Sequence, residues 1–173
     1  MNAIVPLIAV VGLPAWAPNL HPLVVHFPIV WLIAAVAVDL VCVTARARWA
    51  EAAAPWLYAA GAASALAAYL SGRQAAATVL LPGMAQPIVL EHWNWALATT
   101  IYFATVATFR LALTFMKRRL TFWARAGALV AGLAGVFLLY HAAEQGARLV
   151  YEHGVGVAPR AHSDAGAANK ATH

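Results

Sequence analysis

The residues most able to do chemistry in this sequence are histidines that stand in or beside apolar runs. A neutral imidazole binds metal ions well and is a costly side chain to expose to lipid. The candidate ligands are His21, His26, His92, His141 and His153. No Cys-x-x-Cys-His sequence occurs, which excludes a covalently attached c-type haem. The chemistry that this set suggests is axial ligation of a haem b iron between membrane helices.

The composition indicates what kind of protein must hold these histidines. The chain has 173 residues, of which 64% are hydrophobic and only 10% are charged. About a quarter of the residues in a soluble domain are charged, so this chain has too little polar surface for a globule in water. The sequence therefore predicts an integral membrane protein, with membrane lipid as its first partner. The formal charge of +5 gives no indication of a nucleic-acid partner.

Four apolar stretches reach the ~20 residues that a membrane-spanning helix needs. They run from about 22 to 44, 56 to 81, 91 to 115, and 123 to about 153. We expect an all-α, four-helix transmembrane bundle over residues 19–157. Residues 1–18 are too short to span and form a predicted periplasmic interfacial segment, and residues 158–173 form a predicted polar tail.

Basic residues predict the orientation of the bundle in the bacterial inner membrane. Arg46 and Arg48 follow the first span, and the segment 117–119 with Arg125 follows the third. Cytoplasmic loops carry such an excess of Lys and Arg. Both termini are therefore predicted on the periplasmic side, together with all five candidate histidines.

A rise of ~1.5 Å per residue predicts that these histidines lie at two depths. His26 and His141 are expected inside the bilayer, whereas His21, His92 and His153 are expected near its surface. Five residues also rotate a helix by ~140°, so His21 and His26 are not expected to share one ligand plane. One or two haems are consistent with this pattern.

Other residues suit the edge and the faces of a haem. Arg73 and Arg148 are predicted to bind propionates, although both also suit interfacial anchoring. Small residues in the second and fourth spans would let a flat macrocycle approach, but their spacing equally suits a helix-packing seam. Among them are Gly61, Ala65, Ala68, Gly72, Gly132 and Gly135.

Two charges lie inside the apolar spans. Asp39 in the first span and Arg110 in the third are each about seven residues from the cytoplasmic end. Intramembrane charges tend to pair, so we predict an Asp39–Arg110 ion pair with a structural role. On the fourth span, Glu144, Arg148 and Glu152 have the spacing of i,i+4 pairs.

Two motifs resemble those of a known family. The segments His21-Pro-Leu-Val-Val-His-Phe-Pro28 and Gly146-Ala-Arg-Leu-Val-Tyr-Glu-His-Gly-Val-Gly-Val157 are similar to the two ends of a bacterial family of small four-span membrane proteins. That family is catalogued as domain of unknown function 2231. Ala147 stands where the family commonly has the second residue of a Gly-Gly pair. The resemblance implies the four-span fold and its topology, and it leaves the function to the histidines.

The sequence thus favours a b-type cytochrome that passes electrons between a periplasmic cytochrome or dehydrogenase and the quinone pool or a larger complex. No nucleophile, acid–base pair or phosphate-binding loop is evident, so an electron-transfer subunit is expected rather than a stand-alone catalyst. The alternative is a non-haem membrane subunit: a transporter, a copper or zinc protein, or a structural accessory of a larger complex.

Overall fold

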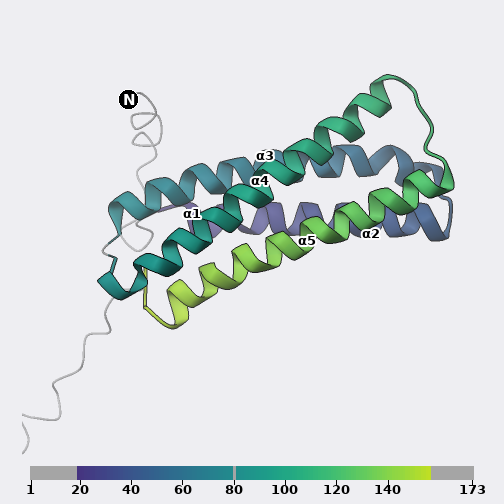
Figure 1. The fold of residues 1–173 in the computed structure, drawn as a ribbon. Coiled ribbons are helices and arrows are strands. Elements are labelled where there is room, and N and C mark those ends of the chain that lie inside the picture. The colour runs from purple at the N-terminus through teal and green to yellow at the C-terminus, as the bar shows by residue number, and fades with distance from the viewer. Residues whose placement is uncertain (1–18, 80, 157–173) are drawn as a thin grey trace, which may run out of the picture.

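The computed structural model describes residues 19–79 and 81–156, and these residues form a bundle of helices (Figure 1). No strand occurs among them. The helices are α1 (His21–Val24), α2 (His26–Thr44), α3 (Arg48–Thr78), α4 (Gln86–Phe115) and α5 (Phe122–Tyr151), with a 3₁₀ turn, η2 (Gly83–Ala85), before α4. The predicted interfacial segment 1–18 and tail 158–173 lie outside the described residues.

Consecutive helices pack side by side, and α5 closes the bundle against α2. Helices α2 and α4 therefore face each other diagonally, as do α3 and α5. The short α1 continues the line of α2 and packs on α3. This arrangement follows from connections too short to carry a helix to the far side of the bundle.

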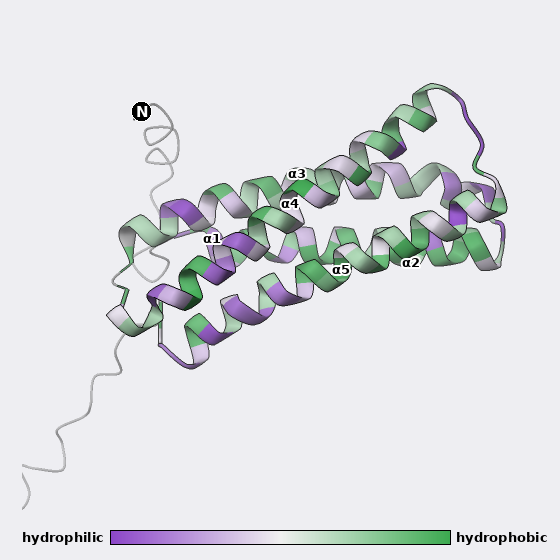
Figure 2. Ribbon diagram, in the orientation of Figure 1, coloured by the Kyte–Doolittle hydropathy of each residue, from purple (hydrophilic) through white to green (hydrophobic). Residues whose placement is uncertain are grey.

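The bundle has two chemically different ends. The histidine end holds α1, the α3–α4 connection and the end of α5, and the basic-loop end holds the α2–α3 and α4–α5 connections (Figure 1). Figure 2 shows hydrophilic residues gathered toward these ends, with an apolar stretch between them. Large apolar side chains cover the outside of that stretch, among them Trp31, Ile33, Phe109, Val130 and Phe137.

Three helical segments are long and apolar enough to cross a membrane: His21–Thr44, Gly83–Phe115 and Phe122–Tyr151. Helix α3 is also long, at 31 residues, but alanine, glycine and polar residues make it less apolar. Three candidate spans are therefore found, and the passage of α3 through the bilayer belongs to the function proposed below.

The first predicted span is broken near its start. Helix α1 ends at Val24 and α2 begins at His26, with a turn at Val25. Pro28 explains the break, because it has no N–H to donate to the carbonyl of Val24 and its ring crowds that carbonyl. Val25 itself keeps helical dihedrals, with φ −62° and ψ −22°, so α1 and α2 run on in one line despite the missing hydrogen bond.

The second helix begins eight residues before the predicted start at Trp56, with Pro55 inside it. Glu51, in its first turn, accepts hydrogen bonds from the Leu120 N–H (3.2 Å) and from Arg125 Nη2 (2.9 Å). Arg125 was expected only to mark the cytoplasmic side. It also ties the start of α3 to the α4–α5 connection.

The predicted ion pair between Asp39 and Arg110 is confirmed. Arg110 Nη2 lies 2.7 Å from Asp39 Oδ1, and the two side chains are only 5% and 2% exposed. Tyr58 Oη donates a further hydrogen bond to Asp39 Oδ2 (2.9 Å). Charge and hydrogen-bonding capacity are thus matched inside an apolar core, which joins α2, α3 and α4.

The core around this trio explains several of the small residues. A Cβ on Gly61 would overlap the Leu32 side chain, one on Gly132 would overlap Tyr58 Oη, and one on Gly135 would overlap the Phe103 ring. These three glycines therefore form a helix-packing seam rather than a slot for a cofactor.

Candidate functional site

The candidate site lies at the histidine end, where the two sequence motifs meet. After α5, Gly154 adopts a positive φ of 61°, which favours glycine because it has no Cβ. The N–H of Gly154 bonds the Val150 carbonyl (3.0 Å), and the N–H of Val155 bonds the Leu149 carbonyl (2.9 Å). The chain is thereby turned so that Val155 and Gly156 line the same cavity as His21.

His21 is oriented by α3. Its Nδ1 lies 3.2 Å from Ser71 Oγ, and the Ser71 hydroxyl donates to the Ala68 carbonyl (3.0 Å). A hydroxyl has a single hydrogen, so Ser71 Oγ must accept from an N–H at His21 Nδ1. This tautomer leaves His21 Nε2 with a free lone pair, which is the state of a metal-binding histidine.

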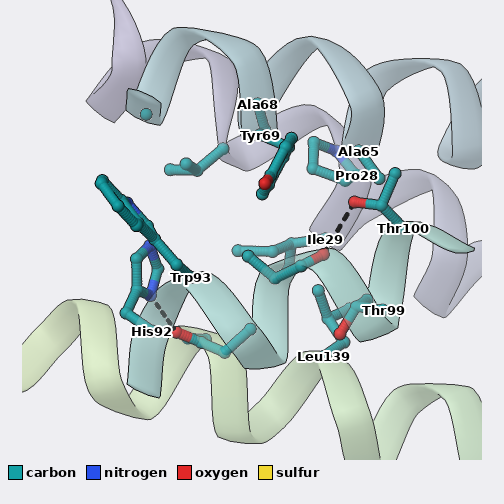
Figure 3. A pocket seen from close by; sticks show the side chains of 15 residues that line it. Pro28, Ile29, Ala65, Ala68, Tyr69, His92, Trp93, Thr99, Thr100 and Leu139 are labelled. Atoms are coloured by element: carbon teal, nitrogen blue, oxygen red, sulfur yellow. Dashed lines mark hydrogen bonds between the residues drawn. The ribbon is translucent and has the colours of Figure 1, made fainter. Parts of the chain in front are cut away.

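His92 is oriented in the same way by α5. Its Nδ1 lies 2.8 Å from the carbonyl oxygen of Ala142. A carbonyl can only accept, so Nδ1 carries the hydrogen and Nε2 again keeps its lone pair. Figure 3 shows this bond and the other ring nitrogen of His92 directed away from α5, into the bundle.

The structure brings His21 and His92 together from diagonally opposite helices. Their ring centroids are 6.3 Å apart, and the ring planes meet at 75°. Glycines allow both rings to pack this closely on the other two helices. A Cβ on Gly72 of α3 would lie 2.9 Å from His21 Cε1, and one on Gly146 of α5 would lie 3.2 Å from His92 Cε1.

Two cavities adjoin this pair of rings. One, of about 140 Å³, is lined by both histidines and by Gly72, Trp93 and Gly146. The other, of about 90 Å³, lies among all four long helices and shares Gly72, His92 and Trp93 with the first. Figure 3 shows His92 and Trp93 at one side of this second cavity. Its walls are almost wholly apolar: Pro28, Ile29, Ala65, Ala68, Leu139 and Ala142.

The two predicted propionate partners differ in their availability. The Arg73 side chain is exposed, and its guanidinium lies 5.5 Å from the Trp93 ring centroid, beside both cavities. Arg148 instead donates to Glu152 Oε1 (3.1 Å) and to Gln145 Oε1 (3.3 Å). The hydrogen bond from Arg148 lowers the pKa of Glu152.

Three of the five candidate histidines are not brought to the His21–His92 pair. His26 has an exposed side chain on α2. His141 packs against Trp95 and bonds Glu144, which was expected to pair with Arg148. The Nε2 atom of His153 is buried without a hydrogen-bond partner among the described residues. In that part of the chain, no three His, Cys, Asp or Glu side chains gather closely enough to hold a metal ion.

The His21–His92 pair offers two imidazole ligands, and the number of protein ligands differs between a haem iron and a bare ion. A porphyrin supplies four nitrogen ligands and leaves two axial positions for the protein, whereas structural zinc requires four protein ligands. For zinc, a metal–imidazole bond is about 2.0–2.1 Å, so two imidazoles facing across one metal have centroids about 6.4 Å apart. The distance observed is 6.3 Å. The two imidazoles match the number of protein ligands that a haem iron takes, but the adjoining cavities of about 90 and 140 Å³ are smaller than a macrocycle, so the walls would have to separate to admit one.

Some residues that build the site had no clear signal in the sequence. Ser71 and the carbonyl of Ala142 orient the two rings, and Gly146 makes room for one of them. A backbone carbonyl cannot be recognised from the residue type. A serine in an alanine-rich helix gives no indication that its hydroxyl bonds a histidine. Only Gly146 lay within a recognised motif.

Comparison with known proteins agrees with this architecture. The model of a family described as "Predicted membrane protein (DUF2231)" matches residues 17–159 of the chain. No curated protein and no solved structure matches the chain. The match spans most of the sequence and includes both motifs that meet at the histidine end, and the chain therefore belongs to this family of membrane proteins.

Proposed function

We propose that this protein is a membrane cytochrome of b type, in which His21 and His92 would hold the haem iron. The observation that carries the proposal is the pair of imidazoles from diagonal helices. Both have Nδ1 held by the protein, both keep Nε2 unprotonated, and their centroids are 6.3 Å apart.

The surrounding residues have defined tasks in this proposal. Ser71 and the Ala142 carbonyl hold the two ligands in one tautomer and raise their basicity. Gly72 and Gly146 leave space beside the rings, and Arg73 is placed to pair with a propionate. When bound, haem b supplies one-electron transfer between ferric and ferrous iron. The apolar cavity walls limit the access of water, which tunes the potential of such a centre.

The proposal includes a position in the membrane. Helix α3 packs along both α2 and α4, so it crosses the same thickness as they do and makes a fourth span. The basic-loop end then faces the cytoplasm of a bacterial inner membrane, and the histidine end faces the periplasm. Electrons would pass between a periplasmic cytochrome or dehydrogenase and the quinone pool, within a larger complex.

Absorption spectra of the purified protein test this assignment. We expect a Soret band that shifts on dithionite reduction and a pyridine haemochrome of b type at one haem per chain. His21→Ala and His92→Ala should each remove the low-spin spectrum, because either substitution would take away one of the two imidazoles that hold the iron. Added imidazole should restore part of it where the variant is folded.

His26→Ala is the matched control, because His26 lies on the same motif but its side chain is exposed. It should keep the full haem content. A wild-type protein free of iron, or both ligand variants with unchanged spectra, would refute the proposal.

One observation favours a second candidate, a two-histidine site for a small metal ion. The cavity of about 140 Å³ is below the roughly 300–1,000 Å³ of pockets for drug-sized ligands. An ion with its water ligands would need less rearrangement of the cavity walls than a macrocycle. A colourless preparation with stoichiometric copper or zinc, lost in His21→Ala and His92→Ala but not in His26→Ala, would select this candidate.

A further inference from the structure

An open groove of about 480 Å³ runs along the outside of the bundle between α3 and α4. Ala59 and Ala63 of α3 and Ala104 of α4 contribute small side chains to its lining. Ala107 is 4% exposed, whereas Ile101, which also lines the groove, is 58% exposed. The groove therefore has a buried floor and an exposed rim, and it opens toward the surroundings of the bundle.

The dimensions of the groove match one lipid chain. From Ala59 to Tyr69 it follows α3 for about 15 Å, at a rise of ~1.5 Å per residue. One leaflet is half of a ~30 Å hydrocarbon core, which is also about 15 Å. Thr108 uses its hydroxyl hydrogen within α4, on the Ala104 carbonyl (2.7 Å), so it offers no free donor to a ligand. An acyl chain fits a groove of this length and chemistry.

An aromatic pair borders the groove at the basic-loop end. Trp56 and Phe115 meet edge to face across α3 and α4, with ring centroids 6.2 Å apart. Each lies about one helical turn beyond a residue of the groove, Ala59 on α3 and Leu111 on α4. Trp56 is 56% exposed and Phe115 is 69% exposed. Exposed tryptophans of membrane proteins lie at the depth of the lipid head groups, so this end of the groove is placed at the interface.

A basic turn follows Phe115 directly and has a defined geometry. The Arg118 N–H donates to the Leu113 carbonyl (3.0 Å). The Lys117 N–H donates to the Thr114 carbonyl (3.0 Å). These two bonds make a Schellman motif, in which the residue of positive φ is usually glycine. Here that residue is Lys117, with a φ of 54°, so a cation occupies a position that the backbone would favour for glycine.

The cations at this corner are available to a ligand. Residues 117–119 and Arg48 are exposed, and none of them forms an ion pair within the part of the chain that the structure describes. Arg48 precedes Ala59 by about three helical turns, so it lies on the same face of α3 as the groove. Glu51, an acidic residue of the same helix turn as Arg48, is already paired with Arg125 at 2.9 Å. Positive charge at the end of the groove is therefore uncompensated.

We propose that this groove binds one anionic phospholipid, with an acyl chain between α3 and α4 and the phosphate on Arg48, Lys117 and Arg118. Small residues would equally let another transmembrane helix approach, but the uncompensated cations at the interface complement a lipid phosphate. The inference goes beyond electron transfer. It uses the proposed passage of α3 through the bilayer and requires no haem.

Quenching of tryptophan fluorescence by brominated phospholipids tests the site. The full chain is reconstituted in phosphatidylcholine vesicles with increasing amounts of brominated phosphatidylglycerol or brominated phosphatidylcholine. The signal of Trp56 is the difference between the wild type and Trp56→Phe. The wild type should bind phosphatidylglycerol at least fivefold more tightly, because each basic side chain near an anionic surface contributes about fivefold in affinity.

Lys117→Gly removes one cation and relaxes the backbone of the turn, so the variant should fold. Its preference for phosphatidylglycerol should fall about fivefold. Arg46→Gly is the matched control, because Arg46 is also a basic residue of positive φ (51°) at the same end, but it follows α2, which does not line the groove. This control should keep the wild-type preference. Equal losses in the two variants would overturn the site, since general positive charge would then attract the lipid.

Ala104→Phe tests the groove itself, because Ala104 is exposed and the larger side chain would fill the groove. The saturable quenching of Trp56 should disappear. Ala37→Phe is the control: Ala37 is an exposed alanine of α2, away from the groove, and its substitution should leave the quenching unchanged. Wild-type quenching in Ala104→Phe would overturn the proposal.

Two further results would also overturn it. One is equal affinity of the wild type for the two brominated lipids. The other is a wild-type dimer in detergent, measured by sedimentation, that Ala104→Phe dissociates and Ala37→Phe does not, since a second copy would then occupy the groove. These measurements need no haem, so they are independent of the spectra that test the proposed function.

Discussion

The five candidate histidines have the same side chain but different surroundings, and the nearest acceptor decides what each can do. Ser71 and the Ala142 carbonyl fix the ring orientations of His21 and His92, whose centroids lie 6.3 Å apart. A carboxylate orients His141 instead, so its free nitrogen can take up a proton. The side chain of His26, only five residues from His21, is exposed.

The contact between Gly72 and His21 supports a prediction at this scale. In Gly72→Ala the new Cβ would lie 2.9 Å from His21 Cε1, so the ring must move. We expect a loss of about 1–3 kcal/mol in the free energy of unfolding. Spectra should show altered axial ligation, and SDS titration should show the loss of stability.

Gly127→Ala is the matched control, since it is also a helical glycine but has no atom within 4 Å of the new Cβ. It should be neutral or stabilising by about 0.5–1 kcal/mol, because alanine favours helix. Equal effects of both substitutions would show that space beside His21 is not limiting.

At the scale of elements, the Asp39–Arg110–Tyr58 trio fixes how far α2, α3 and α4 are shifted along one another. Each partner comes from a different helix, and none is more than 5% exposed. The Arg110 guanidinium also lies 5.6 Å from the Tyr58 ring centroid, and that ring stacks on Phe103. An ion pair alone would join two helices, whereas the tyrosine extends the network to α3.

Asp39→Asn should destabilise the bundle strongly. It leaves Arg110 charged and unpaired in the core, at a cost of about 3–5 kcal/mol. Tyr58→Phe removes only one hydrogen bond to a charged acceptor and should cost about 1.5–3 kcal/mol. Unfolding in SDS, followed by helical circular dichroism, should give this order. The reverse order would mean that the tyrosine, not the ion pair, dominates the register.

At the scale of the whole molecule, charge is distributed unevenly between the two ends. The connections at the basic-loop end carry Arg46 and residues 117–119, whereas the α3–α4 connection has no charged residue in 81–86. This asymmetry is the physical basis for the proposed orientation.

Thiol labelling tests that orientation, and the chain suits it because its sole cysteine, Cys42, is buried. In a Cys42→Ala background, Gly83→Cys should react with a membrane-impermeant maleimide in intact spheroplasts. Arg119→Cys should react only after the membrane is opened. Both positions are exposed, so a difference reports the side of the membrane. The opposite pattern would invert the topology.

Much of this architecture was predictable from the sequence because it depends on composition and period. The apolar runs predicted the helices, and the depths of Asp39 and Arg110 predicted their pairing, because two intramembrane charges stabilise each other. The breaks were less predictable: Pro28 interrupts the first helix, whereas Pro55 is contained within α3. The outcome depends on how neighbouring helices accommodate the missing N–H.

The tertiary structure alone decided which histidines meet. Spacing along the chain placed five imidazoles at one end of the bundle. A helix rotates ~100° per residue, so a small rotation of a helix about its axis changes which side chain each ring contacts. Gly72 beside His21 and Gly146 beside His92 leave the space that lets these two rings pack between the helices. The acceptors that set each tautomer include a backbone carbonyl, which every residue has and which therefore cannot be recognised from the residue type. The sequence therefore determines that histidines occur in a membrane bundle, and the packing of the helices determines that His21 pairs with His92.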